Sequence, residues 1–184
     1  MPYIIIVVIV VVLISALFIG NYNSLVKARQ RTMNSWSQVE VQLQKRFDLI
    51  PNIVEIVKGY AAHESEVLKE VTNLRTSWGS AQTASEKDSA DKKADDLLKS
   101  IFAIAENYPQ LKANGNFTLL QNQLSDIERQ IAFSRQFYND AVTKYNTKLE
   151  VFPSNIFAHM YGFKTAEFYQ LVNEKAKDSV NVKF

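Results

Sequence analysis

The two histidines, His63 and His159, are the side chains with the widest range of possible chemistry in this sequence. In a helical protein they could serve a di-iron centre, which takes a Glu-x-x-His pair from each of two helices and two further carboxylates. Tyr60 and Ile156 stand three residues before the histidines, so neither pair is present. The chain has no cysteine, which removes thiolate ligands and thiol nucleophiles. We expect no metal site and no cofactor.

Motifs for other kinds of catalysis are missing from the sequence as well. It contains no G-x-S-x-G elbow, no P-loop and no G-x-G-x-x-G, and its five glycines are scattered. A net charge of +2 provides no bulk attraction for nucleic acid, so we expect no nucleic-acid partner. The sequence favours a protein that is not an enzyme. A Ser-Lys or carboxylate pair assembled by folding stays open.

Several charged residues fall beside or between apolar positions of the predicted helices. Such residues could form a polar pocket or a switch, or they could pair between helices and fix their register. The spacing favours pairing, which is weak evidence of activity. The residues concerned are Glu40, Arg46, Glu64, Glu128 and Arg135.

Three Tyr-Asn pairs are a second polar pattern. We expect them near the membrane-side ends of the first and last long helices, in a hydrogen-bonded layer that serves packing rather than ligand binding. The pairs are Tyr22-Asn23, Tyr138-Asn139 and Tyr145-Asn146.

The N-terminal stretch is apolar for long enough to cross a bilayer. Residues 3 to 20 carry no charge, and a spanning helix needs roughly 20 apolar residues, with a range of about 17 to 25. No basic residue precedes the stretch and no small-residue cleavage site follows it, unlike a secretion signal. We predict a retained membrane anchor over residues 1–21. It includes Tyr3, Ile9, Leu13, Ile19 and Gly20.

Charges that flank the anchor predict its orientation. Lys27, Arg29 and Arg31 follow it, whereas only the α-amino group precedes it. The positive-inside rule therefore predicts a single-pass membrane protein, with its N-terminus outside and the rest in the cytoplasm.

Beyond the anchor the apolar residues recur with helical period. We predict an all-α fold, in which an antiparallel four-helix up-and-down bundle over residues 22–152 has helices near 22–50, 51–78, 86–108 and 116–152. Pro51 should start the second helix and force a break or kink just before it. Thr83 and Glu86 should form a capping box, within a polar and solvated connection over residues 80–93. Asn116 should cap the last helix, and Pro153 should stop it.

Aromatic residues are concentrated after the last helix, in residues 153–184. The up-and-down order would bring this segment to the membrane-side end of the bundle. There it could contact the membrane surface or a second copy of the chain, or it could plug the open end of the bundle. The residues are the aromatic Phe157, Tyr161, Phe163, Phe168 and Tyr169, together with Met160.

Long blocks of the sequence, from Tyr22 to Glu64, Tyr108 to Asn146 and Phe152 to Phe163, resemble the LemA family of bacterial membrane proteins. Phe47, where tyrosine is usual, and Gly115, where glutamate is common, are small departures. The resemblance implies an N-terminal anchor and antiparallel helices, and it implies no catalysed reaction. A magnetosome membrane-biogenesis protein among the family's relatives implies a membrane-shaping role.

These observations favour a self-assembling scaffold or membrane-organising protein. Its expected partners are the lipid bilayer and other copies of the chain, with other membrane proteins as further candidates. An adaptor or sensor subunit for a membrane enzyme such as a protease is the alternative. A hydrolase whose site forms only on folding is the third class.

Overall fold

The computed structural model describes residues 2–60 and 65–169, without the side chains of residues 65–69. Every regular element in these residues is a helix, which confirms the all-α prediction. The helices are α1 (Pro2–Lys58), α2 (Ser65–Ser80), α3 (Ala84–Asn107), α4 (Pro109–Lys112), α5 (Gly115–Glu150) and α6 (Ser154–Met160).

α1 is a single helix of 57 residues that begins with the predicted anchor. Its N-terminal part is long and apolar enough to cross a membrane, and none of that part is buried against the rest of the protein. The one aliphatic hydroxyl there is satisfied within the helix, because Ser15 Oγ donates to the Val11 carbonyl oxygen at 2.8 Å. Tyr3, Ile9, Leu13 and Ile19 are all exposed along this part, as lipid-facing residues would be.

The predicted break at Pro51 is wrong, because α1 continues through this residue to Lys58. A proline inside a helix costs about 3 kcal/mol, whereas burying one large apolar side chain gains about 1.5 to 3 kcal/mol. Because the helix is continuous, several buried side chains on both sides of Pro51 lie on one face of it. The free energy gained by burying them together outweighs the cost of the proline. They are Phe47, Ile50, Ile53, Val54 and Val57.

The chain turns at Gly59 and Tyr60 instead, where Tyr60 N–H donates to the Val57 carbonyl oxygen at 3.0 Å. The predicted second helix over 51–78 is therefore divided between α1 and α2. His63 and Glu64 lie outside the described residues.

The predicted capping box is confirmed at the start of α3. Glu86 N–H donates to Thr83 Oγ1 at 3.2 Å, and Thr83 N–H donates to Glu86 Oε2 at 3.0 Å. The prediction of a solvated connection over residues 80–93 is wrong, however, because α3 begins at Ala84 and buries Asp88, Ala90 and Asp91.

The ends of α5 lie close to the predicted ones. Its cap is Asn114 rather than Asn116, since Asn114 Oδ1 accepts from Asn116 N–H at 2.9 Å and from Phe117 N–H at 3.2 Å. The helix stops at Glu150, shortly before Pro153.

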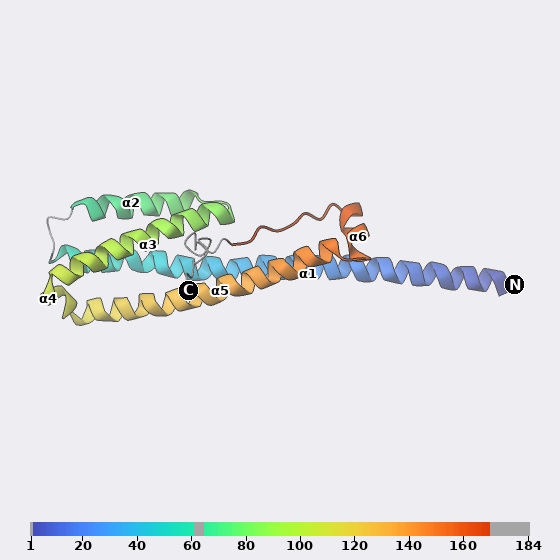
Figure 1. Ribbon diagram of the computed structural model, residues 1–184, viewed down its shortest axis with the longest axis horizontal. Helices are drawn as coiled ribbons and strands as arrows, with labels where there is room; N and C mark the ends of the chain where they lie inside the picture. The colour runs from blue at the N-terminus through green and yellow to red at the C-terminus, as the bar shows by residue number, and fades with distance from the viewer. Residues whose placement is uncertain (1, 61–64, 170–184) are drawn as a thin grey trace, which may run out of the picture.

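The molecule is elongated (Figure 1). α1 and α5 pack side by side, while the α2–α3 hairpin lies beside the part of α1 that is farthest from the N-terminus. α6 lies against α1 near the end of the apolar part, and residues 161–169 run back from it along the helices. The largest core cluster joins α1, α2, α3 and α5, and it includes the buried Leu124 of α5.

Candidate functional site: a buried ion network and a C-terminal strap

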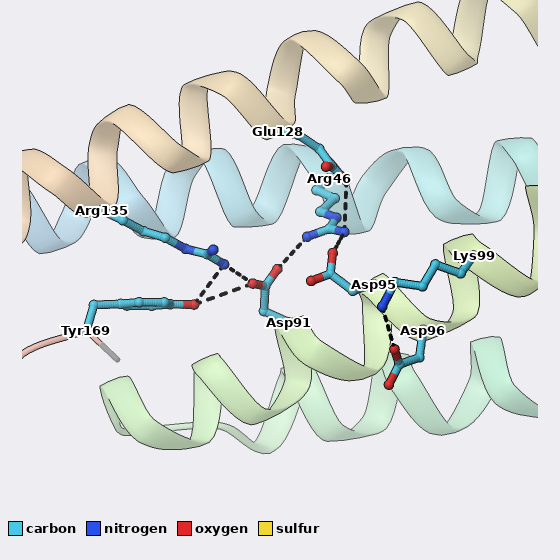
Figure 2. Close-up of polar contacts among 8 residues, drawn as sticks. All are labelled: Arg46, Asp91, Asp95, Asp96, Lys99, Glu128, Arg135 and Tyr169. Carbon is cyan, nitrogen blue, oxygen red and sulfur yellow. Dashed lines mark hydrogen bonds and ion pairs between the residues drawn. The ribbon is translucent and has the colours of Figure 1, made fainter. Parts of the chain in front are cut away.

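Asp91 of α3 is the centre of a buried group of charges between α1, α3 and α5. Its side chain is only 2% exposed, and each of its oxygens meets a guanidinium. Arg46 Nη1 donates to Oδ1 at 2.9 Å, and Arg135 Nη2 donates to Oδ2. Figure 2 shows these side chains converging from three helices. Asp91 therefore bridges α1 to α5 through α3.

Arg46 extends the group toward the surface. Its Nη2 donates to Asp95 Oδ1 and lies 3.0 Å from Glu128 Oε1. The Asp95 and Glu128 side chains are partly exposed, whereas that of Arg46 is buried. Three carboxylates thus surround a cation that water hardly reaches. We call Arg46, Asp91, Asp95, Glu128, Arg135 and Tyr169 the ion network.

Tyr169 joins the network from the C-terminal segment. Its hydroxyl accepts from Arg135 Nη2 at 3.1 Å and lies 3.4 Å from Asp91 Oδ2, to which it donates. The Arg135 guanidinium carbon also lies 4.6 Å from the centre of the tyrosine ring. Burial and the neighbouring Asp91 carboxylate raise the pKa of Tyr169 above its ordinary value, so the hydroxyl keeps its proton.

Burial has opposing consequences for the two central charges. It raises the pKa of the Asp91 carboxyl, against the Arg46 and Arg135 guanidiniums, which act to lower it. The Arg46 pKa is raised, because Asp91, Asp95 and Glu128 together outweigh the burial that would lower it. Arginine stays charged in proteins, so the network always holds two cations that need a carboxylate between them.

The contacts of the network are those of interhelical pairing, the interpretation that the sequence favoured. Arg46, Glu128 and Arg135 all take part, and Glu40 of α1 pairs separately with Lys87 of α3. Both oxygens of Asp91 are already occupied by arginines, so this carboxylate is not free to act as a base.

The sequence analysis missed Asp91 and Asp95, because they stand in or beside a run of polar residues. A signal was present nonetheless. Stepping back from Ala105 by four and three residues reaches Ile101, Leu98, Ala94 and Asp91, which places Asp91 on the buried stripe of α3.

A second polar arrangement holds the extended residues 164–169, which we call the strap, against α5. Asn139 Nδ2 donates to the Tyr169 carbonyl oxygen at 3.1 Å, and its Oδ1 accepts from Tyr169 N–H at 2.9 Å. Asn146 makes the same two bonds with Ala166, each 2.9 Å long. Each asparagine thus pairs with a strap residue as a neighbouring β-strand would.

The tyrosines next to these asparagines repeat the pattern. Tyr138 Oη donates to the Glu167 carbonyl oxygen and Tyr145 Oη to that of Lys164, both at 2.8 Å. The two Tyr-Asn pairs are seven residues apart, which is about 10.5 Å along a helix. Three residues of extended chain cover about 10 Å, the same distance. The two Tyr-Asn pairs can therefore bond to strap residues that are three positions apart.

The expected single layer of three Tyr-Asn pairs is therefore wrong. Two pairs bind the strap, while the Tyr22 ring packs edge-on against Tyr161, with ring centres 4.9 Å apart. The bonding partners of the α5 pairs lie 19 to 30 residues along the chain, beyond the reach of a local pattern.

The aromatic residues after α5 do not form one cluster. Phe157 is buried at the anchor side, with its ring centre 4.7 Å from that of Phe18, and Tyr169 is buried in the ion network. Phe163 is half-buried beside Arg29. Phe157 and Tyr169 thus make internal contacts in the described part of the chain. Met160, Tyr161 and Phe168 remain exposed.

An exposed apolar surface that the sequence analysis missed lies where α1 and α5 pack together. Val41, Phe133 and Phe137 are 52%, 61% and 62% exposed, and they line a groove of about 440 Å³. We call these three residues the apolar face. The sequence signal for this face was the pair Phe133 and Phe137, which are four residues apart and so lie on one side of a helix.

Within the described ranges, no three histidine, cysteine or acidic residues lie close enough to hold a metal ion. His159 is exposed on α6.

The chain is similar to proteins of one family. The family model described as the LemA family matches residues 35–184. Magnetosome protein MamQ 2 of Paramagnetospirillum magneticum is 27% identical, over 87% of this chain and 68% of that protein. Magnetosome protein MamQ of Magnetospirillum gryphiswaldense is 25% identical, over 80% and 64%. Protein LemA of Metamycoplasma hominis is 21% identical, over 83% and 70%. Since the family model covers most of the chain, this protein belongs to the LemA family.

Proposed function

We propose that this protein is a non-enzymatic, membrane-anchored scaffold that assembles with other copies of itself. The apolar face is the observation that carries the proposal. Large exposed apolar side chains grouped on a protein surface commonly mark a contact with another protein. In addition, Gln42 Oε1 is buried beside the apolar face with no hydrogen-bond partner among the described residues, and a neighbouring copy could supply the donor.

The scaffold in this proposal is one antiparallel four-helix bundle made of α1, α2, α3 and α5. The bundle is rigid because the ion network and the strap hold α1, α3 and α5 together. The continuous helix α1 transmits the position of the bundle to the anchor. Because anchored chains share a membrane plane, weak contacts between them act at high effective concentration.

The orientation is part of the proposal. The apolar helix, and relatives that include magnetosome proteins, support membrane association. The basic flank after the anchor supports an outside N-terminus and a cytoplasmic bundle in a bacterial cytoplasmic membrane. A reporter that is active only outside the cytoplasm, fused after Phe184, should be silent. Activity of the reporter would mean that the protein has the opposite orientation.

The test of self-assembly compares the full-length wild type in mild detergent with a Phe133→Ser/Phe137→Ser variant, each sized by light scattering. We expect the wild type to be oligomeric and the variant to shift toward the monomer, because two large apolar contacts are lost. Tyr108→Ser, far from the apolar face and also exposed, should keep the assembly.

Three results would change the proposal. A monomeric wild type across the concentration range would contradict self-assembly. Equal assembly of wild type and variant would remove the apolar face from the contact, and a Met160→Ser/Tyr161→Ser variant then tests the exposed residues of α6 and its end. A stoichiometric complex with a different membrane protein, lost in the Phe133/Phe137 variant, would support the adaptor role.

A further inference from the structure

A basic groove lies between α1 and α5 on the side of the molecule nearer the anchor. Its volume is about 630 Å³, and three cations line it, Lys27 and Arg31 from α1 and Lys144 from α5. Asp140 is the one acidic residue among the described residues of its lining, which together carry a net charge of +2. We call this the basic groove.

The three cations form no ion pair or hydrogen bond within the described residues. Other cations nearby are engaged, since Arg29 lies over the Phe163 ring and Lys148 bonds to Ser24 Oγ. The basic groove therefore brings together three cations that have no partner among the described residues. Neutral donors from Gln30, Asn34 and Ser35 line it as well, and such a mixture of cations and neutral donors suits a phosphate with attached polar groups.

The position of the basic groove indicates where the phosphate comes from. Lys27 and Arg31 follow Gly20 by seven and eleven residues, which places them about 10 and 16 Å beyond the apolar part of α1. The headgroup layer occupies roughly 5 to 8 Å on each side of the hydrocarbon core. Long basic side chains reach back toward such a layer from just beyond it.

We propose that the basic groove binds the headgroup phosphate of an anionic phospholipid. The proposal rests on the membrane anchor but not on self-assembly. The lipid would touch the bundle at the α1–α5 packing surface, and so it would set the height and tilt of α1 at the membrane. Three basic residues near an anionic surface together strengthen lipid binding by roughly 100-fold.

The experiment uses the full-length protein in mild detergent and measures bound lipid by native mass spectrometry during titration with phosphatidylglycerol or phosphatidylcholine. The wild type should retain phosphatidylglycerol in preference to phosphatidylcholine. Lys27→Gln/Arg31→Gln/Lys144→Gln should weaken phosphatidylglycerol binding by roughly 100-fold. Asp140→Asn removes the one opposing charge of the basic groove and should strengthen binding several-fold.

A charge-matched variant controls for bulk electrostatics. Lys45→Gln/Arg75→Gln/Lys112→Gln removes three cations far from the anchor, and Lys45 lies about 27 Å farther along α1 than Lys27. Binding should be unchanged in this variant.

Equal weakening by both triple variants, or no preference for phosphatidylglycerol in the wild type, would overturn the proposal. Displacement of the lipid by millimolar inorganic phosphate would also overturn it, in favour of a free phosphate as the ligand. Oligomeric mass is read from the same spectra, so a failure of lipid binding is distinguished from a failure of self-assembly.

Discussion

Replacing Asp91 with alanine should destabilise the protein by about 3 to 5 kcal/mol, the usual cost of removing one partner from a buried ion group. Among the described residues, the variant would leave Arg135 without a carboxylate and Arg46 with only its partly exposed partners Asp95 and Glu128. It would also remove the acceptor of the Tyr169 hydroxyl. Asp91→Asn keeps the volume but removes the charge and replaces one acceptor oxygen with an N–H donor that would face an arginine, so it should cost nearly as much.

Denaturant unfolding of the full-length protein in mild detergent, followed by circular dichroism, measures this effect. Asp96→Ala is the matched control on the same helix, because Asp96 pairs with Lys99 at the surface and its side chain is 78% exposed. Such surface pairs contribute at most about 1 kcal/mol. A similar loss in the two variants would mean that Asp91 is hydrated and that the ion network does not hold the helices together.

Features encoded in a few neighbouring residues were predictable from the sequence. The apolar stretch of α1 needs only length and composition, and the Thr83–Glu86 capping box needs only two residues three apart. The helix through Pro51 was not predictable in this way. The local effect of proline favours a break in the helix. The helix continues because the residues around Pro51 are buried in the core cluster with other helices.

The candidate site shows the same limit more clearly. Arg46, Glu128 and Arg135 were visible as charges beside apolar positions, but their common partner Asp91 was hidden within a polar run. The strap has no periodic pattern at all, since extended chain bound through its backbone places few demands on its side chains. The Tyr-Asn pairs were visible, but their partners were not.

The strap depends on two asparagines, and replacing both should release it from α5. Leucine has a similar volume to asparagine but no hydrogen-bonding group, so Asn139→Leu/Asn146→Leu removes four bonds to the backbone of Ala166 and Tyr169. At about 1 kcal/mol for each bond, the strap loses about 4 kcal/mol of attachment. Release of the strap would also withdraw Tyr169 from Asp91 and Arg135.

Limited trypsin digestion measures the release, because Lys164 is the first residue of the strap and its backbone carbonyl is held by Tyr145. Cleavage after Lys164, followed by mass spectrometry, should be at least 10-fold faster in the double variant, since proteolysis depends on the population of locally opened chain. The loss in global stability should be smaller than the loss in attachment, because a detached strap leaves the contacts between α1 and α5 in place. Asn122→Leu, an exposed position on the same helix, should cleave at the wild-type rate. An unchanged rate in the double variant would mean that side-chain burial, chiefly of Tyr169, holds the strap without the asparagine bonds.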